Sequence, residues 1–112
     1  MAGVITDNQS VPANGTVVNV YTGQLDEFLQ DDSIVQLGIV GAASGLFYTL
    51  IVGKEVIVQD QEMSDANRFP QDPEDFVIQA AGLQGDRLVL SLRNSTAGAL
   101  VVRSITKINA VN

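Results

Sequence analysis

The sequence predicts an all-β fold, a two-sheet antiparallel sandwich of about eight strands of the jelly-roll type, with an immunoglobulin-like sandwich as the alternative. Short runs of aliphatic residues recur at spacings of about 8 to 12 residues, with turn residues between them. Aromatic residues make up only 5% of the chain, so Val, Ile, Leu and Ala must fill the core. One long polar connection, Met63 to Asp75, separates the runs and is typical of a crossing at the end of a sandwich.

The chain divides into an arm and one domain. Residues 1–15 mix Gly, Pro, Asn, Asp and Ser with a short apolar stretch at Val4-Ile5, and they are predicted to be a flexible N-terminal arm. Residues 16–112 have a length close to that of a common single domain, so they are predicted to form one β-sandwich domain.

The first half of this domain contains three predicted elements. Thr16 to Tyr21 is predicted to be a strand, and Leu25 to Leu29 is either a strand or one helical turn. Ile34 to Val40 alternates at the two-residue period of a pleated strand, and the small residues from Gly41 to Gly45 form the loop that ends it.

The middle of the chain carries the strongest local pattern. Leu46 to Val52 and Glu55 to Gln61 flank Gly53-Lys54, and a two-residue connection that begins with Gly predicts a type II′ β-hairpin. Phe76 to Gln79 follows the long connection as a short strand, and Gly82 to Gly85 is a turn.

The last two runs are predicted to pair as a hairpin, Asp86 to Arg93 with Ala99 to Ile108, across Asn94 to Gly98. The first run places alternating leucines on one face. The second run is apolar on both faces, with Val101 and Ile105 opposite its core side. This strand is therefore predicted to be covered twice, by its own core and by another subunit.

Composition excludes several classes of function. Thirteen acids against six bases give a net charge of −7, which argues against nucleic acid and anionic membranes as partners. The charged fraction is 17%, below the usual level of about 25%, which indicates a surface partly covered by neighbouring subunits. The N-terminus lacks the basic and apolar regions of a signal peptide, so the chain is expected to be made as a soluble cytosolic protein.

The inventory of reactive side chains argues against an enzyme. Histidine and cysteine are absent, which excludes Ser-His-Asp, Cys-His and zinc-histidine sites, and no phosphate-binding loop is present. Acids cluster around residues 26–32 and 72–75 without the spacing of a calcium loop, so they are read as solvated loop acids, with bound Ca²⁺ as the open alternative. We predict no catalytic, cofactor-binding or metal-binding residues.

Two further motifs have alternative readings. Arg68-Phe69-Pro70 joins a cation and a Phe before a rigid proline, and it either anchors the long loop in a neighbouring subunit, with Arg on an acid, or closes the end of its own sandwich. The sequons at Asn14 and Asn94 are predicted to be turn chemistry rather than glycosylation sites.

The closing half of the chain resembles small phage virion proteins. The stretch from Asp72 to Phe76, followed by the one from Gly85 to Leu100, is similar to the β-sandwich capsid and capsid-decoration (cement) proteins of bacteriophages. The resemblance implies a virion structural protein that works as a trimer or larger homo-oligomer on a capsid shell protein, without catalytic residues. It leaves open whether the chain is a decoration protein, a minor capsid subunit or a tail component.

We therefore expect a non-enzymatic virion subunit whose partners are copies of itself and the shell. The alternative is a β-sandwich module that binds a small ligand or carbohydrate, although carbohydrate modules usually present aromatic platforms and this chain has no Trp and two Tyr. The residues predicted to form subunit contacts are Val4, Ile5, Arg68, Phe69, Pro70, Val101 and Ile105.

Overall fold

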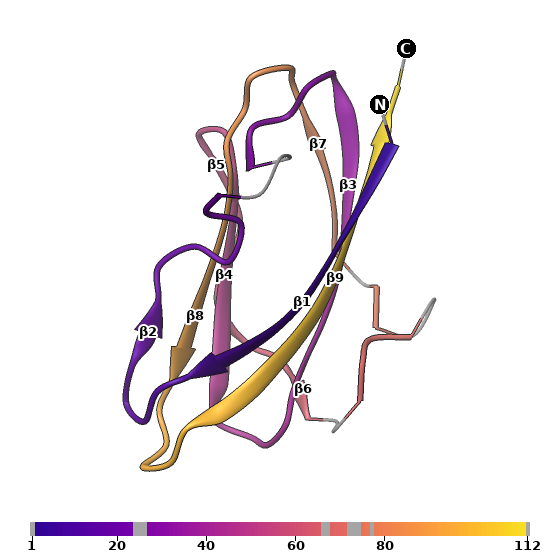
Figure 1. Cartoon of the computed structure of the whole chain (residues 1–112). Helices are drawn as coiled ribbons and strands as arrows, with labels where there is room; N and C mark the ends of the chain where they lie inside the picture. Colours follow the sequence, from indigo (N-terminus) through magenta and orange to yellow (C-terminus); the bar gives the residue numbers. More distant parts are fainter. Residues whose placement is uncertain (1, 24–26, 66–67, 72–74, 77, 112) are drawn as a thin grey trace.

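The structure is a computed structural model that describes residues 2–23, 27–65, 68–71, 75–76 and 78–111. These residues form nine strands and no α-helix, and the strands make two sheets that pack face to face (Figure 1). The predicted all-β two-sheet sandwich is confirmed.

The first sheet, sheet A, is built around three long strands in the order β1-β9-β3. Its strands are β1 (Ala2–Val11), β9 (Leu100–Ala110), β3 (Ser33–Gly41), β7 (Ile78–Gly82) and β6 (Ser64–Asp65). Strands β7 and β6 both pair with the edge of β3 that faces away from β9. Strand β7 pairs antiparallel with the first half of β3, and β6 pairs parallel with its last two residues.

The second sheet, sheet B, has the order β2-β8-β4-β5. Its strands are β2 (Thr16–Val17), β8 (Leu88–Asn94), β4 (Leu46–Val52) and β5 (Glu55–Glu62). Strands β4 and β5 form the hairpin predicted across Gly53-Lys54. Gly53 has a φ of 63° whereas Lys54 keeps a negative φ, as a type II′ turn requires.

The strand pairs nest inside one another along the chain. Strand β1 pairs with β9, β2 with β8, β3 with β7, and β4 with β5, all antiparallel. Pairing from the two ends of the chain inward, with the pairs divided between two sheets, is the arrangement of a jelly roll. The sandwich therefore has the jelly-roll order.

The predicted hairpin between the last two runs is wrong. Strands β8 and β9 lie in different sheets, and the connection between them crosses from sheet B to sheet A. The buried Asn94 side chain fixes this crossing, because its Nδ2 donates to the carbonyl of Val11 at 3.1 Å and to that of Gly98 at 2.9 Å. Its Oδ1 accepts bonds from the backbone N–H and hydroxyl of Thr96. The sequon at Asn94 is thus turn chemistry with a buried amide.

The predicted flexible arm is also corrected. Residues Ala2–Val11 form strand β1, which pairs with β9 over ten positions. Five polar residues in succession hide this strand in the sequence. Only Ile5 and Val11 need to be buried, because an edge strand is stabilised by backbone hydrogen bonds that do not depend on the side chains.

Two shorter elements differ in extent from the prediction. The first strand of sheet B is limited to Thr16–Val17, and residues 18–23 instead form bends and turns beside β8. The strand predicted from Phe76 is β7, which begins at Ile78 and extends to Gly82. Phe28, in the segment read as strand or helical turn, forms an isolated bridge with Arg87.

Both sheets contribute to one hydrophobic core. The largest fully buried aliphatic residues are Leu37 of sheet A and Leu46, Leu50, Leu88, Leu90 and Leu92 of sheet B. Each fully buried Leu of this kind contributes about 1.5 to 3 kcal/mol relative to an exposed one. The alternating leucines predicted in the run before Arg93 are confirmed as its core face.

Candidate functional site

The outer face of sheet A brings together most of the residues predicted to form subunit contacts. Val4 lies on β1 with 65% of its surface exposed, and Val101 and Ile105 are half-buried on the neighbouring strand β9. These three side chains point away from sheet B because they alternate with core residues. Thr6 lies opposite Ile105, and Ser10 opposite Val101, so the apolar groups are mixed with small polar ones.

Ile5 does not belong to this face. It points between the two sheets, is 7% exposed and packs in the core. The prediction of Ile5 as a contact residue is corrected, because neighbouring residues of a strand point to opposite faces and only Val4 of the pair faces outward.

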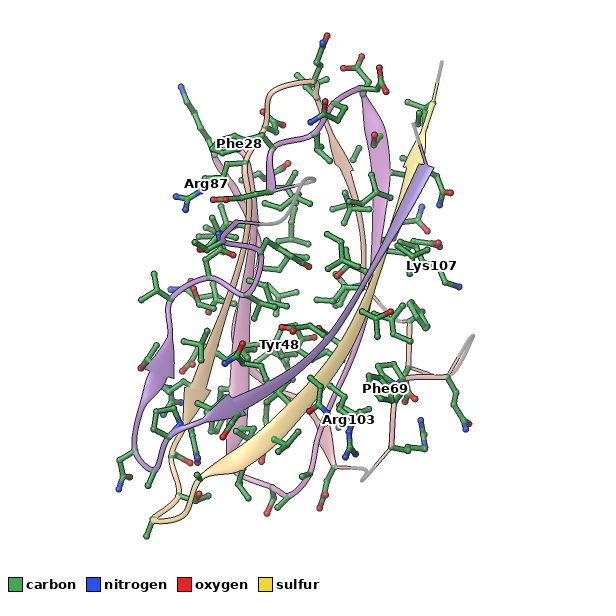
Figure 2. All side chains as sticks on the ribbon, in the orientation of Figure 1. Phe28, Tyr48, Phe69, Arg87, Arg103 and Lys107 are labelled. Atoms are coloured by element: carbon green, nitrogen blue, oxygen red, sulfur yellow. The ribbon has the colours of Figure 1, made fainter. Side chains whose placement is uncertain are left out.

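The Arg68-Phe69-Pro70 motif packs on its own sheet A (Figure 2). The guanidinium of Arg103 lies 5.6 Å from the centre of the Phe69 ring. Pro70 is buried against Gly38 of β3, where an added Cβ would lie 2.9 Å from the Pro70 Cβ. Gly38 therefore allows the connection to approach the strand closely.

Arg68 forms an ion pair with Asp75 of the same connection. Asp75 also accepts a hydrogen bond from the backbone N–H of Gln71 at 2.8 Å. The hydrogen bond from Arg68, with that from Gln71, lowers the pKa of the Asp75 carboxyl. The motif thus makes its contacts within its own chain, and Phe69 stays 41% exposed.

Strand β1 has an unpaired edge. It lies at the end of sheet A, and no other described strand pairs with its second side. The strand is ten residues long and contains no proline and no lysine. Such an edge presents a row of backbone donors and acceptors to another chain.

A pocket of about 480 Å³ opens between the sheets on the opposite side of the sandwich. Its walls come from β3 and β7 of sheet A and from β4 and β5 of sheet B. The apolar lining consists of Leu37, Ile39, Ile57, Val58, Met63 and Ile78, and the polar lining of Tyr48, Gln59, Gln61, Glu62, Ser64 and Asp75. The volume is in the range of pockets that hold small organic molecules.

Tyr48 is the most buried of the polar residues that line this pocket. It lies between the sheets (Figure 2), and only 4% of its surface is exposed. Its hydroxyl makes no hydrogen bond with any residue that the structure describes, although the ring belongs to the core. Burial raises the pKa of Tyr48, so the hydroxyl stays protonated at neutral pH and offers both a donor and an acceptor.

A β-bulge in β5 shapes the pocket wall. Pairing with β4 shifts register between Tyr48 and Leu50, and Asp60 has a φ of 48°. The backbone N–H of Asp60 donates to the Thr49 hydroxyl at 3.0 Å. Its carboxylate accepts two hydrogen bonds of 2.9 Å from Arg93, which lower its pKa. These contacts hold the bulge that places Gln61 opposite Tyr48.

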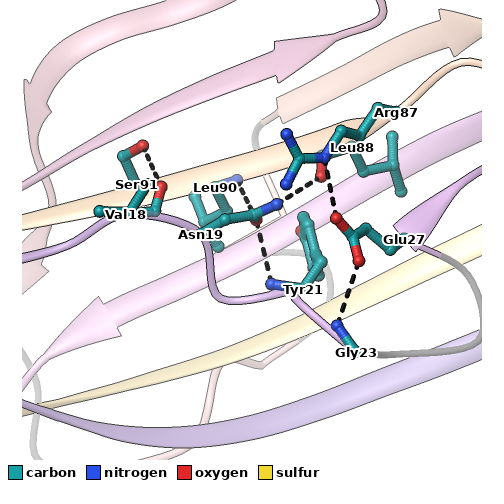
Figure 3. A network of polar contacts seen from close by, with 9 residues as sticks. All are labelled: Val18, Asn19, Tyr21, Gly23, Glu27, Arg87, Leu88, Leu90 and Ser91. Atoms are coloured by element: carbon teal, nitrogen blue, oxygen red, sulfur yellow. Dashed lines mark hydrogen bonds and ion pairs between the residues drawn. The ribbon is translucent and has the colours of Figure 1, made fainter.

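The other side of the sandwich is closed by residues 18–21 (Figure 3). Asn19 donates from Nδ2 to the carbonyl of Leu88, and its Oδ1 accepts from the N–H groups of Tyr21 and Leu90, each at 3.1 Å. The Tyr21 hydroxyl lies 2.7 Å from that of Thr106 in sheet A. Burial raises the pKa of Tyr21 far above its usual value. The side-chain polar groups of Asn19 and Tyr21 are therefore paired.

The two predicted acidic groups are described only in part. Among the residues that the structure describes, no three acidic side chains are grouped so as to hold a metal ion. Glu27 instead accepts from the N–H of Gly23 and from Arg87, and these bonds lower its pKa (Figure 3). Asp26, Asp72 and Glu74 lie outside the described residues.

Comparisons with models of protein families, with curated proteins and with solved structures found no match for this chain. In the part of the chain that the structure describes, no helix has the length and apolarity to span a membrane.

Proposed function

We propose that this protein is a non-enzymatic structural subunit of a virus particle, a capsid decoration (cement) or minor capsid protein that stabilises a shell through contacts with copies of itself and with the shell protein. The jelly-roll order supports the proposal, because this fold is common among viral capsid domains, although lectins and cupins share it. The resemblance of residues 72–76 and 85–100 to phage virion proteins points the same way.

The observation that carries the proposal is the unpaired edge of β1. Soluble proteins usually blunt such an edge with a lysine, a proline, a very short strand or an inward-pointing charge, and of these β1 has only the last. Its one charge, Asp7, is on the side of the strand that faces sheet B. The outer face beside this edge adds Val4, Val101 and Ile105 to the surface available to a second copy.

The oligomeric state tests the proposal. Light scattering on the purified chain is expected to give a trimer or a larger homo-oligomer. The double variant Thr6→Lys/Asn8→Lys adds two charges to the exposed outer side of β1 and is expected to shift the oligomer towards the monomer. The control Val56→Lys/Gln84→Lys adds the same charge at exposed positions away from β1 and is expected to leave the mass unchanged.

A monomer at all concentrations up to about 1 mM contradicts homo-oligomeric assembly, because lattice contacts of millimolar affinity still associate there. If the double variant Thr6→Lys/Asn8→Lys keeps the oligomeric mass of the wild type, the contact between subunits lies elsewhere on the chain. The virion assignment has its own test, since the flanking genes are expected to encode other particle proteins, and a neighbourhood without any such gene contradicts it.

A further inference from the structure

We propose that the pocket between β5 and the β3–β7 side of sheet A binds a neutral small molecule that has an apolar body and a hydroxyl or carbonyl group. This site is separate from the β1 edge and is not needed for the assembly proposed above. Its evidence is the pocket volume of about 480 Å³, the composition of its walls and the unpartnered hydroxyl of Tyr48.

The Tyr48 hydroxyl indicates a polar contact in the ligand. A buried tyrosine usually finds a hydrogen-bond partner for its hydroxyl, because leaving the group unpaired costs free energy. Most of the Tyr48 side chain is buried, but its hydroxyl oxygen is open to the pocket and has no partner among the described residues, none of which has a buried side-chain oxygen or nitrogen left unpaired. A hydroxyl or carbonyl group of a ligand satisfies it, and the amide side chain of Gln61 on the neighbouring strand offers a second contact.

The walls indicate the body of the ligand. Aliphatic side chains line the pocket from both sheets, Leu37, Ile39 and Ile78 from sheet A and Ile57 and Val58 from sheet B. Ile57 and Val58 remain only partly buried although they face this space. An apolar ligand body that covers them removes their surface from water, which favours binding by about 25 cal/mol per Å² before the costs of association.

The charges around the pocket exclude an anion. Glu62 and Asp75 are both in the lining, and none of the described lining residues is Lys or Arg. Both carboxylates already have partners, since Glu62 accepts from the N–H of Gly45 at 3.0 Å and Asp75 accepts from Arg68 and Gln71. A cation is therefore not required to neutralise them, and a neutral ligand fits best.

The experiment uses the full chain and a neutral fluorescent probe, N-phenyl-1-naphthylamine, which brightens in apolar pockets. We expect saturable binding of the probe. Octanol, octanoate and octylammonium have the same eight-carbon chain and differ in the charge of the head group. Their competition with the probe therefore shows which head group the pocket prefers. Octanol is expected to displace the probe at the lowest concentration, and octanoate at the highest.

Variants locate the site. Val58→Trp fills the pocket and is expected to abolish probe binding, whereas Val56→Trp, which faces outward on the same strand, is expected to preserve it. Tyr48→Phe keeps the ring and removes the hydroxyl, so octanol is expected to bind about three- to tenfold more weakly while the probe binds as before. Far-UV circular dichroism and the thermal midpoint of each variant check the fold.

Absence of saturable binding, or equal binding to the two Trp variants, overturns the proposal. Preference for octanoate or octylammonium overturns the neutral class of ligand. If Val58→Trp changes the oligomeric mass and the wild-type oligomer excludes the probe, a second copy of the chain occupies the pocket and the proposal is likewise overturned. Should Val58→Trp fail to fold, the Tyr48→Phe comparison decides, because an unchanged octanol affinity contradicts the role of the hydroxyl.

Discussion

The two tyrosines of this chain lie on opposite sides of the same sandwich and differ in how their hydroxyls are paired. Tyr21 is fully buried on the closed side, and its hydroxyl lies 2.7 Å from that of Thr106. Tyr48 is nearly as buried, but its hydroxyl faces a pocket of about 480 Å³ and has no partner among the described residues. The chain itself supplies the hydrogen-bond partner of the Tyr21 hydroxyl, whereas a ligand or solvent must supply the partner of the Tyr48 hydroxyl.

The difference follows from what lies beside each edge of sheet B. On the closed side, residues 18–21 continue past the short strand β2 and bond to β8, so that polar backbone and side-chain groups are paired. On the open side, the bulge at Asp60 interrupts the pairing of β5 with β4. Bulges are frequent at sheet edges and beside functional sites, where they redirect a side chain or end the strand pairing.

The largest expected effect comes from breaking the closed side at Asn19. Asn19→Ala leaves two backbone N–H groups and one carbonyl without their partner in a buried setting, and each such group costs about 1 to 3 kcal/mol. We expect a loss of about 3 kcal/mol in the free energy of unfolding, measured by urea denaturation. Asn8→Ala, at an exposed position of β1, is the control and should change stability by less than about 0.5 kcal/mol. A loss below about 1 kcal/mol at Asn19 would show that water replaces these bonds.

The two tyrosine hydroxyls provide the second and sharper test. Tyr21→Phe leaves the Thr106 hydroxyl unpaired in the core and should cost about 1 to 2 kcal/mol. Tyr48→Phe removes a hydroxyl without a partner, so its stability should stay within about 0.5 kcal/mol of the wild type. Urea midpoints of the two variants measure the contrast. Equal losses would mean that the Tyr48 hydroxyl is paired in solution and that the two sides do not differ.

The sequence was sufficient to predict the fold class and the elements that depend on local pattern. Strand β3 and the β4–β5 hairpin follow from alternation and from the Gly53-Lys54 turn, which are properties of neighbouring residues. The pairing of β8 was not predicted, because five residues from Asn94 to Gly98 suit a hairpin as well as a crossing. The choice depends on bonds from Asn94 to Val11, a residue 83 positions away in the chain.

The candidate sites were only partly predictable. The outward side chains on β9 and the packing of the 68–70 motif follow from alternation and from a rigid proline, and the sequence placed Val101 and Ile105 correctly opposite the core side of their strand. The pocket was missed. Tyr48 alternates with leucines and therefore resembles an ordinary core residue, while the bulge beside it depends on Arg93, which reaches Asp60 from two strands away in sheet B. The one local clue was a Tyr on an otherwise aliphatic face.

The smallest expected effect concerns acid, because the Asp60 carboxylate holds the bulge on the open side, whereas the contact of Tyr21 with Thr106 on the closed side joins two neutral hydroxyls. Hydrogen bonds from Arg93 lower the pKa of Asp60 in the folded state, below its unfolded value of about 3.9. The Asp60 contribution to stability is therefore fully present above that value and is lost as the pH falls through the folded pKa. Asn keeps the left-handed backbone accessible, so Asp60→Asn removes the charge and one of the two acceptors of Arg93 without straining the bulge. The variant should be less stable than the wild type at pH 7 and equal to it near pH 2, as measured by urea midpoints. The difference in stability between Tyr21→Phe and the wild type should stay constant over this pH range. If that stability difference also vanishes in acid, the distinction between the two sides is contradicted.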